Sequence, residues 1–105
     1  MTTFEEREKG YEAKFKRDQE FQFKATARRN KLLGLWAAEK LGLSGGDADA
    51  YAKEVVVADF EEPGDDDVLR KVAGDLDGKG ASADDVRREM DRLMAVAAEQ
   101  VASES

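Results

Sequence analysis

The residues best suited to bind a metal ion lie between positions 75 and 86. Asp75, Asp77 and Gly80 match positions one, three and six of an EF-hand calcium loop. The fifth position is Lys79, whose charge would repel calcium, and the twelfth is Val86, where the loop needs a bidentate glutamate. The spacing therefore predicts a turn that ends a helix, and no metal site.

Catalytic chemistry finds little support in the rest of the sequence. The chain has no Cys and no His, so it lacks thiolate nucleophiles, the usual zinc ligands and the side chain best suited to proton transfer near neutral pH. Ser44 and the two glycines after it do not have the Gly-x-x-x-x-Gly-Lys-Ser/Thr spacing of a phosphate-binding P-loop. We expect a protein that is not an enzyme and that binds no cofactor.

One cluster of charge could contact another molecule. Lys24, Arg28, Arg29 and Lys31 form a predicted basic patch. The patch could face an acidic protein or a nucleotide phosphate, or it could pair with acidic helices of the chain itself. We expect the internal pairing, because most of the acidic residues follow in the second half of the chain.

The overall balance of charge excludes some partners. The 105 residues include 24 Asp and Glu against 17 Lys and Arg, for a formal net charge of −7. Nucleic acid and anionic membranes attract positive fields, so we expect no nucleic-acid partner and no direct membrane insertion. No apolar run approaches the length of a membrane span, and the first ten residues lack the apolar region of a secretory signal. We expect a cytoplasmic protein that is monomeric when free.

Segments rich in Gly, together with the single Pro, divide the chain into four predicted helices. The breaks lie at residues 42–46, 63–64 and 78–82. The first helix is predicted over residues 20–41 and the second over residues 47–60, the third begins after residue 64, and the fourth opens at Ser82.

Local signals support the last three helices. Residues 65–67 are all Asp and fall in a first turn, where the helix dipole favours negative charge. Ser82 and Asp85 have the spacing of a capping box. In the second segment, the three Val residues at 55–57 could instead form a strand. Their flanking residues are poor strand formers, so we expect a helix there.

These elements predict an all-α protein. Short connections make successive amphipathic helices pack antiparallel. We therefore predict a four-helix bundle over residues 20–105, with a flexible, helix-prone N-terminal extension. The periodicity alone equally allows a looser all-α arrangement. The centre of the bundle is predicted to contain the large side chains Leu32, Trp36, Phe60 and Leu76.

The bundle does not need residues 1–19. Phe4, Tyr11 and Phe15 are seven and then four residues apart and share one helical face, but they are too few to bury a helix against a core. Gly10 costs about 1 kcal/mol of helix stability relative to Ala. We expect a segment between disorder and helix that orders on binding a partner. A solvated N-terminal extension is the alternative interpretation.

One long stretch of the sequence points to a family. The run FQFKATARRNKLLGLW from Phe21 to Trp36, its continuation AAEKLGLSGGDADAYAKEVVVADFEEPGDDDVLRKVAGDL and the opening TTFEEREKGYEAKF closely resemble the zeta-subunit ATPase inhibitor family of the F-type ATP synthase of α-proteobacteria. The resemblance covers essentially the whole chain. It is strongest from Phe21 to Leu76 and weakest after Gly78.

The resemblance implies a regulatory inhibitor subunit. In this family the N-terminal segment enters a catalytic interface of the ATP synthase headpiece as a helix and blocks ATP hydrolysis. Residues 1–19 would then be a mobile inhibitory segment, and the bound protein would lie at the inner membrane surface. The implied contacts are Phe4, Glu5, Glu6, Arg7, Glu8, Lys9, Tyr11, Glu12, Lys14 and Phe15. From the residues alone, the alternative is a small helical adaptor that binds a soluble protein through the basic face of its first helix.

Overall fold

Four helices make up the described part of the computed structural model. The structure describes the backbone of residues 3–61 and 65–104, and the side chains of residues 19–59 and 65–104. The helices are α1 (Thr3–Lys40), α2 (Gly45–Glu61), α3 (Asp65–Asp75) and α4 (Ala83–Glu104). The described residues contain no strand, so the predicted all-α class is confirmed and residues 55–57 are helical.

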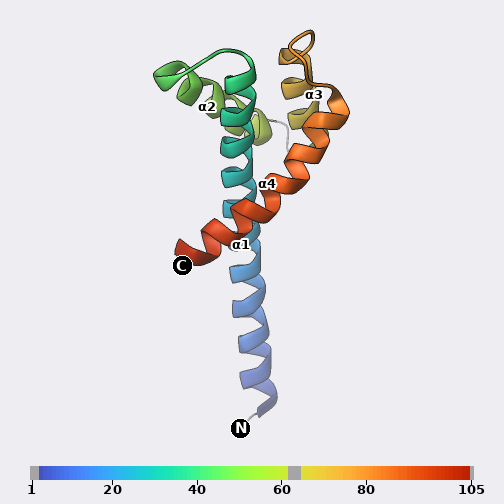
Figure 1. Cartoon of the computed structure of the whole chain (residues 1–105). Helices are drawn as coiled ribbons and strands as arrows, with labels where there is room; N and C mark the ends of the chain where they lie inside the picture. Colours follow the sequence, from blue (N-terminus) through green and yellow to red (C-terminus); the bar gives the residue numbers. More distant parts are fainter. Residues whose placement is uncertain (1–2, 62–64, 105) are drawn as a thin grey trace.

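The first helix is much longer than the others and organises the fold. α2 and α4 both pack against the C-terminal half of α1, and α3 contacts both α2 and α4 (Figure 1). The N-terminal half of α1 projects beyond the other helices, which gives the molecule principal dimensions of 64 × 25 × 23 Å. The predicted start at residue 20 was therefore wrong, because Gly10 does not end the helix and α1 begins at Thr3.

The core lies where all four helices meet. Its central buried residues are Leu33, Ala37, Ala38, Tyr51, Val55, Val68, Val72, Leu76, Val86, Met90 and Leu93. The prediction of Leu76 is confirmed, but Leu32 and Trp36 are only partly buried at the edge of the core. α1 turns Leu33 and Ala37 inward, and Leu32 and Trp36 lie about 100° around the helix from them. The side chain of Phe60, the fourth predicted centre, lies outside the described residues.

Small residues let α1 and α2 approach closely. A Cβ atom added to Gly34 would lie 2.5 Å from the Cα atom of Ala52 and 3.1 Å from its Cβ atom. Real Cβ atoms do not come so near to backbone, so only Gly fits on α1 at this crossing. Ala52 and the neighbouring Val55 are buried against it.

The ends of the helices follow known capping chemistry. After α1, the Leu43 N–H donates to the Ala38 carbonyl (2.9 Å) and the Gly42 N–H donates to the Glu39 carbonyl (3.1 Å), with Gly42 at φ 79°. This pattern is a Schellman motif, in which Gly accepts the left-handed conformation.

The predicted capping box at the start of α4 is confirmed. The Ser82 N–H donates to Asp85 Oδ2 (2.9 Å) and the Asp85 N–H donates to Ser82 Oγ (3.2 Å). The bond from the Ser82 N–H, with a further contribution from the Ser82 side chain, lowers the pKa of the Asp85 carboxyl below its ordinary value.

The Gly34 crossing can be tested with a pair of Gly→Ala variants. Gly34→Ala is expected to lower the free energy of unfolding by about 1–3 kcal/mol, because the added methyl group forces α1 and α2 apart. Gly74 lies near the end of α3 and has no atom within 4 Å of an added Cβ. Gly74→Ala is therefore expected to be neutral or to stabilise by at most about 1 kcal/mol. Denaturant unfolding measures both, and equal effects would contradict the close crossing.

A candidate protein-binding site at the base of the bundle

α1 leaves the bundle close to Ala25. Ala25 is 3% exposed, whereas Gln22, Phe23 and Lys24 before it are exposed. The part of α1 from Thr3 to Lys24 therefore extends from the base of the bundle over roughly 33 Å, at 1.5 Å of rise per residue (Figure 1).

All ten residues predicted to contact the ATP synthase belong to this projecting part of α1. Their backbone is helical from Thr3 onward and continuous with the buried half of the same helix. Their side chains lie outside the described residues, so the predicted aromatic stripe of Phe4, Tyr11 and Phe15 stays a prediction. The predicted mobility of residues 1–19 in the free protein also stays a prediction.

The predicted basic patch is not one surface. Arg29 is 2% exposed and points into the bundle, where its guanidinium donates to Asn30 Oδ1 (2.7 Å from Nη2) and to Asp65 Oδ1 (3.0 Å). The expected pairing with the chain's own acidic residues is thus observed for Arg29, through Asp65 at the start of α3. Arg29 belongs to the fold and presents no surface to a partner.

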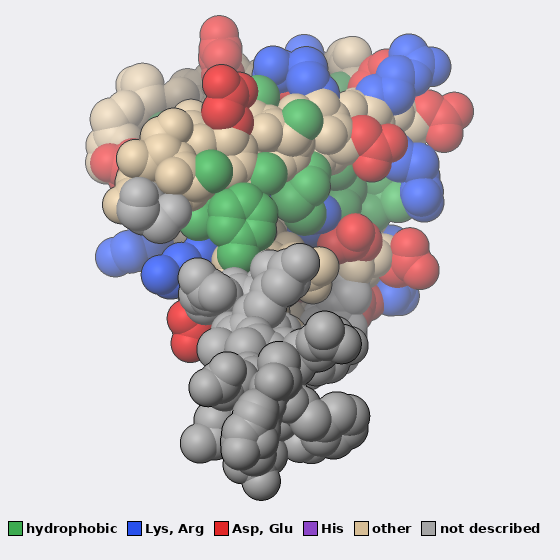
Figure 2. Space-filling view, turned by 90° about the horizontal axis from the view of Figure 1, so that it is seen from below, with side chains coloured by type: hydrophobic (Ala, Val, Ile, Leu, Met, Phe, Trp, Pro, Cys, Tyr) green, Lys and Arg blue, Asp and Glu red, His purple; other side chains and the backbone are tan. Residues whose placement is uncertain are grey.

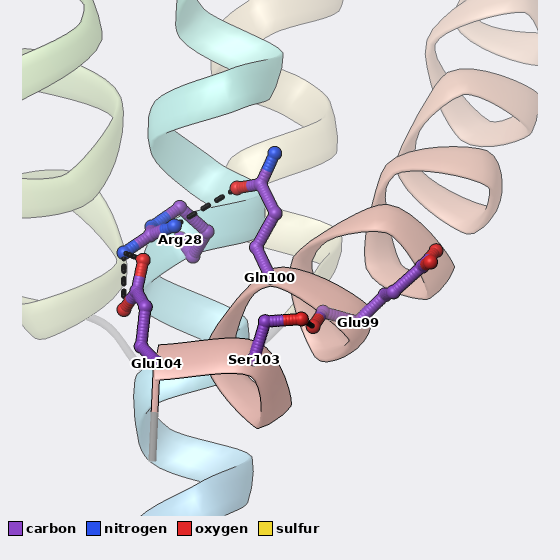
Figure 3. Close-up of polar contacts among 5 residues, drawn as sticks. All are labelled: Arg28, Glu99, Gln100, Ser103 and Glu104. Atoms are coloured by element: carbon purple, nitrogen blue, oxygen red, sulfur yellow. Dashed lines mark hydrogen bonds and ion pairs between the residues drawn. The ribbon is translucent and has the colours of Figure 1, made fainter.

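Arg28 is also paired within the chain, but at the surface. Its Nη1 donates to Gln100 Oε1 (2.9 Å), and its Nη2 donates to both carboxylate oxygens of Glu104 (2.6 and 2.8 Å). Figure 3 shows Gln100 and Glu104 reaching from the last turns of α4 to Arg28 on α1. These bonds fix the end of α4 against α1 and hold the guanidinium in one orientation.

A groove brings together the rest of the patch. It has a volume of about 570 Å³ and runs between α1, α2 and α4. We call it the basal groove, and its described lining consists of Phe23, Lys24, Ala27, Arg28, Lys31, Val56, Val101 and Glu104. Lys24 and Lys31 are both exposed, and neither forms an ion pair with another described side chain. Figure 2, which views the molecule from below, shows apolar side chains gathered on the base with cations at their edges.

Only part of this groove is predictable from the sequence. The helical spacing from Phe23 to Lys31 marks one side of α1. Val56 on α2 and Val101 and Glu104 on α4 reach it only through the fold. No local signal relates these residues to a patch on the first helix, because the contacts join segments more than twenty residues apart in sequence.

Asp75, the first residue of the rejected calcium loop, has side-chain partners within the bundle. The Tyr51 hydroxyl donates to Asp75 Oδ2 (2.8 Å), and Lys71 Nζ lies 3.2 Å from the same oxygen. Burial and the bond to Asp75 raise the pKa of Tyr51, so its hydroxyl keeps its proton. The described residues contain no group of three possible metal ligands. Among their helices, none has the length and apolar character needed to span a membrane.

Comparison with known proteins identifies the family. The sequence profile of ATPase inhibitor subunit zeta matches residues 1–100. The chain belongs to this family. The match includes the projecting part of α1 as well as the bundle, so both parts belong to the zeta family pattern. The family name describes an inhibitor subunit, which is a regulatory class of protein.

A solved structure supports the fold of this zeta-family chain. A solution NMR structure matches it with a TM-score of 0.72 and 62% sequence identity, covering 80% of this chain and 98% of the other. No curated protein matches the chain.

The division of the basic patch predicts unequal effects on stability for two of its members. Arg29→Ala is expected to lower the free energy of unfolding by about 2–4 kcal/mol, because it removes buried bonds and leaves the buried Asn30 oxygen without its donor. Lys24→Ala is expected to change it by less than about 0.5 kcal/mol, since Lys24 is exposed. Urea unfolding of the two variants provides the comparison, and a stable Arg29→Ala variant would show that Arg29 is not structural.

Proposed function

We propose that this chain inhibits ATP hydrolysis by the F-type ATP synthase. In this proposal, the N-terminal part of α1 enters a catalytic interface of the headpiece as a helix. The observation that carries the proposal is the continuity of α1, which runs without a break from the buried bundle into the projecting part. Membership of the zeta inhibitor family supports the choice of target.

The inhibition would be a steric and conformational block. Hydrolysis requires catalytic interfaces to open and close in turn, and a helix wedged into one interface would hold it between these states. The chain itself would perform no chemistry. The bundle of residues 20–105 would position and retain the wedge, and the protein would act as a monomer bound to the headpiece at the membrane surface.

The fold lowers the cost of presenting such a wedge. An isolated helix of about 20 residues is marginal in water because forming its first turn is unfavourable. In this chain the buried half of α1 already supplies that first turn, so each residue before Ala25 needs only to extend an existing helix. The projecting segment can therefore order on binding with a smaller loss of conformational entropy than a free peptide.

The wedge can be tested through its aromatic residues. Changing Tyr11 and Phe15 together to Ala is expected to weaken inhibition of ATP hydrolysis by at least tenfold, because aromatic anchors dominate most interfaces. The melting temperature is expected to stay close to that of the parent, since the core is built from residues beyond position 24. The measurement is a titration of ATP hydrolysis by the cognate headpiece.

A conservative pair of changes provides the control. Tyr11→Phe with Phe15→Leu keeps apolar bulk at both positions and is expected to inhibit nearly as well as the parent. A chain without residues 2–19 is expected to stay folded and to lose inhibition. Full inhibition by the double Ala variant would show that these aromatic residues are not the anchors of the wedge.

A further inference from the structure

We propose that the basal groove is a second contact with the inhibited ATPase and that it receives an acidic segment carrying an apolar side chain. This inference rests on the proposed function, because it identifies what the bundle binds while the N-terminal part of α1 is inserted. The groove would then retain the inhibitor, and the wedge would block catalysis.

The chemistry of the groove selects such a segment. Phe23, Val56 and Val101 supply apolar surface, and Phe23 is 59% exposed, the highest value among the large apolar side chains described. Burying exposed aromatic surface is favourable in protein interfaces. Lys24 and Lys31 lie two turns apart on the α1 side of this surface. A partner helix or loop that combines an apolar side chain with carboxylates would satisfy both features.

The charge of the groove differs in sign from that of the chain. The described lining includes three cations and one anion, Glu104, whereas the whole chain carries a net charge of −7. The basal groove is therefore a locally positive site on an acidic protein. Complementary charge of this kind steers association and fixes the orientation of the partner.

Arg28 adds a preorganised donor to the groove. Its bonds to Gln100 and Glu104 orient the guanidinium at the edge of the groove (Figure 3). An Arg side chain that is already ordered loses less entropy when it contacts a carboxylate. The end of α4 thus contributes to the groove both Val101 and the residues that hold Arg28 in place.

The position of the groove favours the ATPase as its occupant. Phe23 follows Phe15 by eight residues, which is about 12 Å along the axis of α1. The groove opens beside the point where the projecting helix leaves the bundle. A protein large enough to enclose the N-terminal part of α1 is therefore brought against this surface. A second copy of the chain is disfavoured, because both copies carry the same net charge.

The test compares charge reversals at two ends of the full-length chain. Lys24→Glu with Lys31→Glu reverses the charge at the two exposed lysines of the basal groove. Lys79→Glu with Arg88→Glu makes the same change in net charge at exposed positions around the α3–α4 connection, outside the groove. Inhibition of ATP hydrolysis by the cognate headpiece is titrated at low and at moderate salt. A third variant, Phe23→Ala, removes apolar surface without removing charge.

The groove variants are expected to need about tenfold more protein for half-maximal inhibition, with a weaker dependence on salt. The control pair is expected to stay within about twofold of the parent, as is usual for charges outside an interface. The Phe23→Ala variant is also expected to inhibit less well. All variants should retain the parent's circular dichroism melting temperature, since the substituted residues are exposed.

Two results would overturn the inference. One is parent-like inhibition by the groove variants, and the other is equal weakening by the groove and control pairs, which would reflect overall charge alone. Sedimentation of the free chain tests the alternative occupant: a dimer that the groove variants dissociate would assign the groove to a second copy. The double Ala variant at residues 11 and 15 leaves the groove intact. It therefore tests the proposed wedge separately from the groove.

Discussion

The burial of one half of α1 is the constraint on which the rest of the structure depends. From Ala25 to Ala38 the helix supplies the inner surface against which α2 and α4 pack, and Gly34 allows α2 to cross it at close range. These contacts set the direction in which α1 leaves the bundle, and the residues before Ala25 continue the same helix. The starting direction of the N-terminal half of α1 thus depends on how α2 and α4 pack against the C-terminal half (Figure 1).

Neighbouring cations on α1 have different roles: some stabilise the fold and others remain exposed at the basal groove. Arg29 turns inward and joins α1 to the start of α3, whereas Arg28, one residue earlier, joins α1 to the end of α4. Lys24 and Lys31 remain at the surface of the basal groove. Neighbouring cations in the sequence therefore have different roles, which follow from the 100° rotation between successive residues of a helix. The bundle keeps a small positive surface on an acidic protein close to the projecting helix.

Much of this fold could be predicted from the sequence, for physical reasons. The start of α4 was predictable because Ser82 and Asp85 interact locally. The all-α class was predictable because Gly and Pro breaks separate amphipathic segments. The length of α1 was not predictable. Gly10 and the few apolar residues before position 20 weaken the local helix signals, but they do not decide whether this segment is helical. Trp36 was placed wrongly at the centre because size alone does not tell which face of a helix turns inward. The basal groove depends on α2 and α4 meeting α1, and no local pattern contains that information.

In the proposed mechanism, the bundle presents the inhibitory segment as a continuation of its own first helix. The most direct test of this mechanism is the titration of ATP hydrolysis by the cognate headpiece with a Glu20→Pro variant, using Glu20→Ala as the control. Pro inside a helix breaks or kinks it at a cost of about 3 kcal/mol, and Glu20 is exposed, outside the core. We predict strongly weakened inhibition by the Pro variant and normal inhibition by the Ala variant. The bundle should remain folded in both, because position 20 precedes Ala25, the first buried residue described on α1. Parent-like inhibition by the Pro variant would contradict this mechanism.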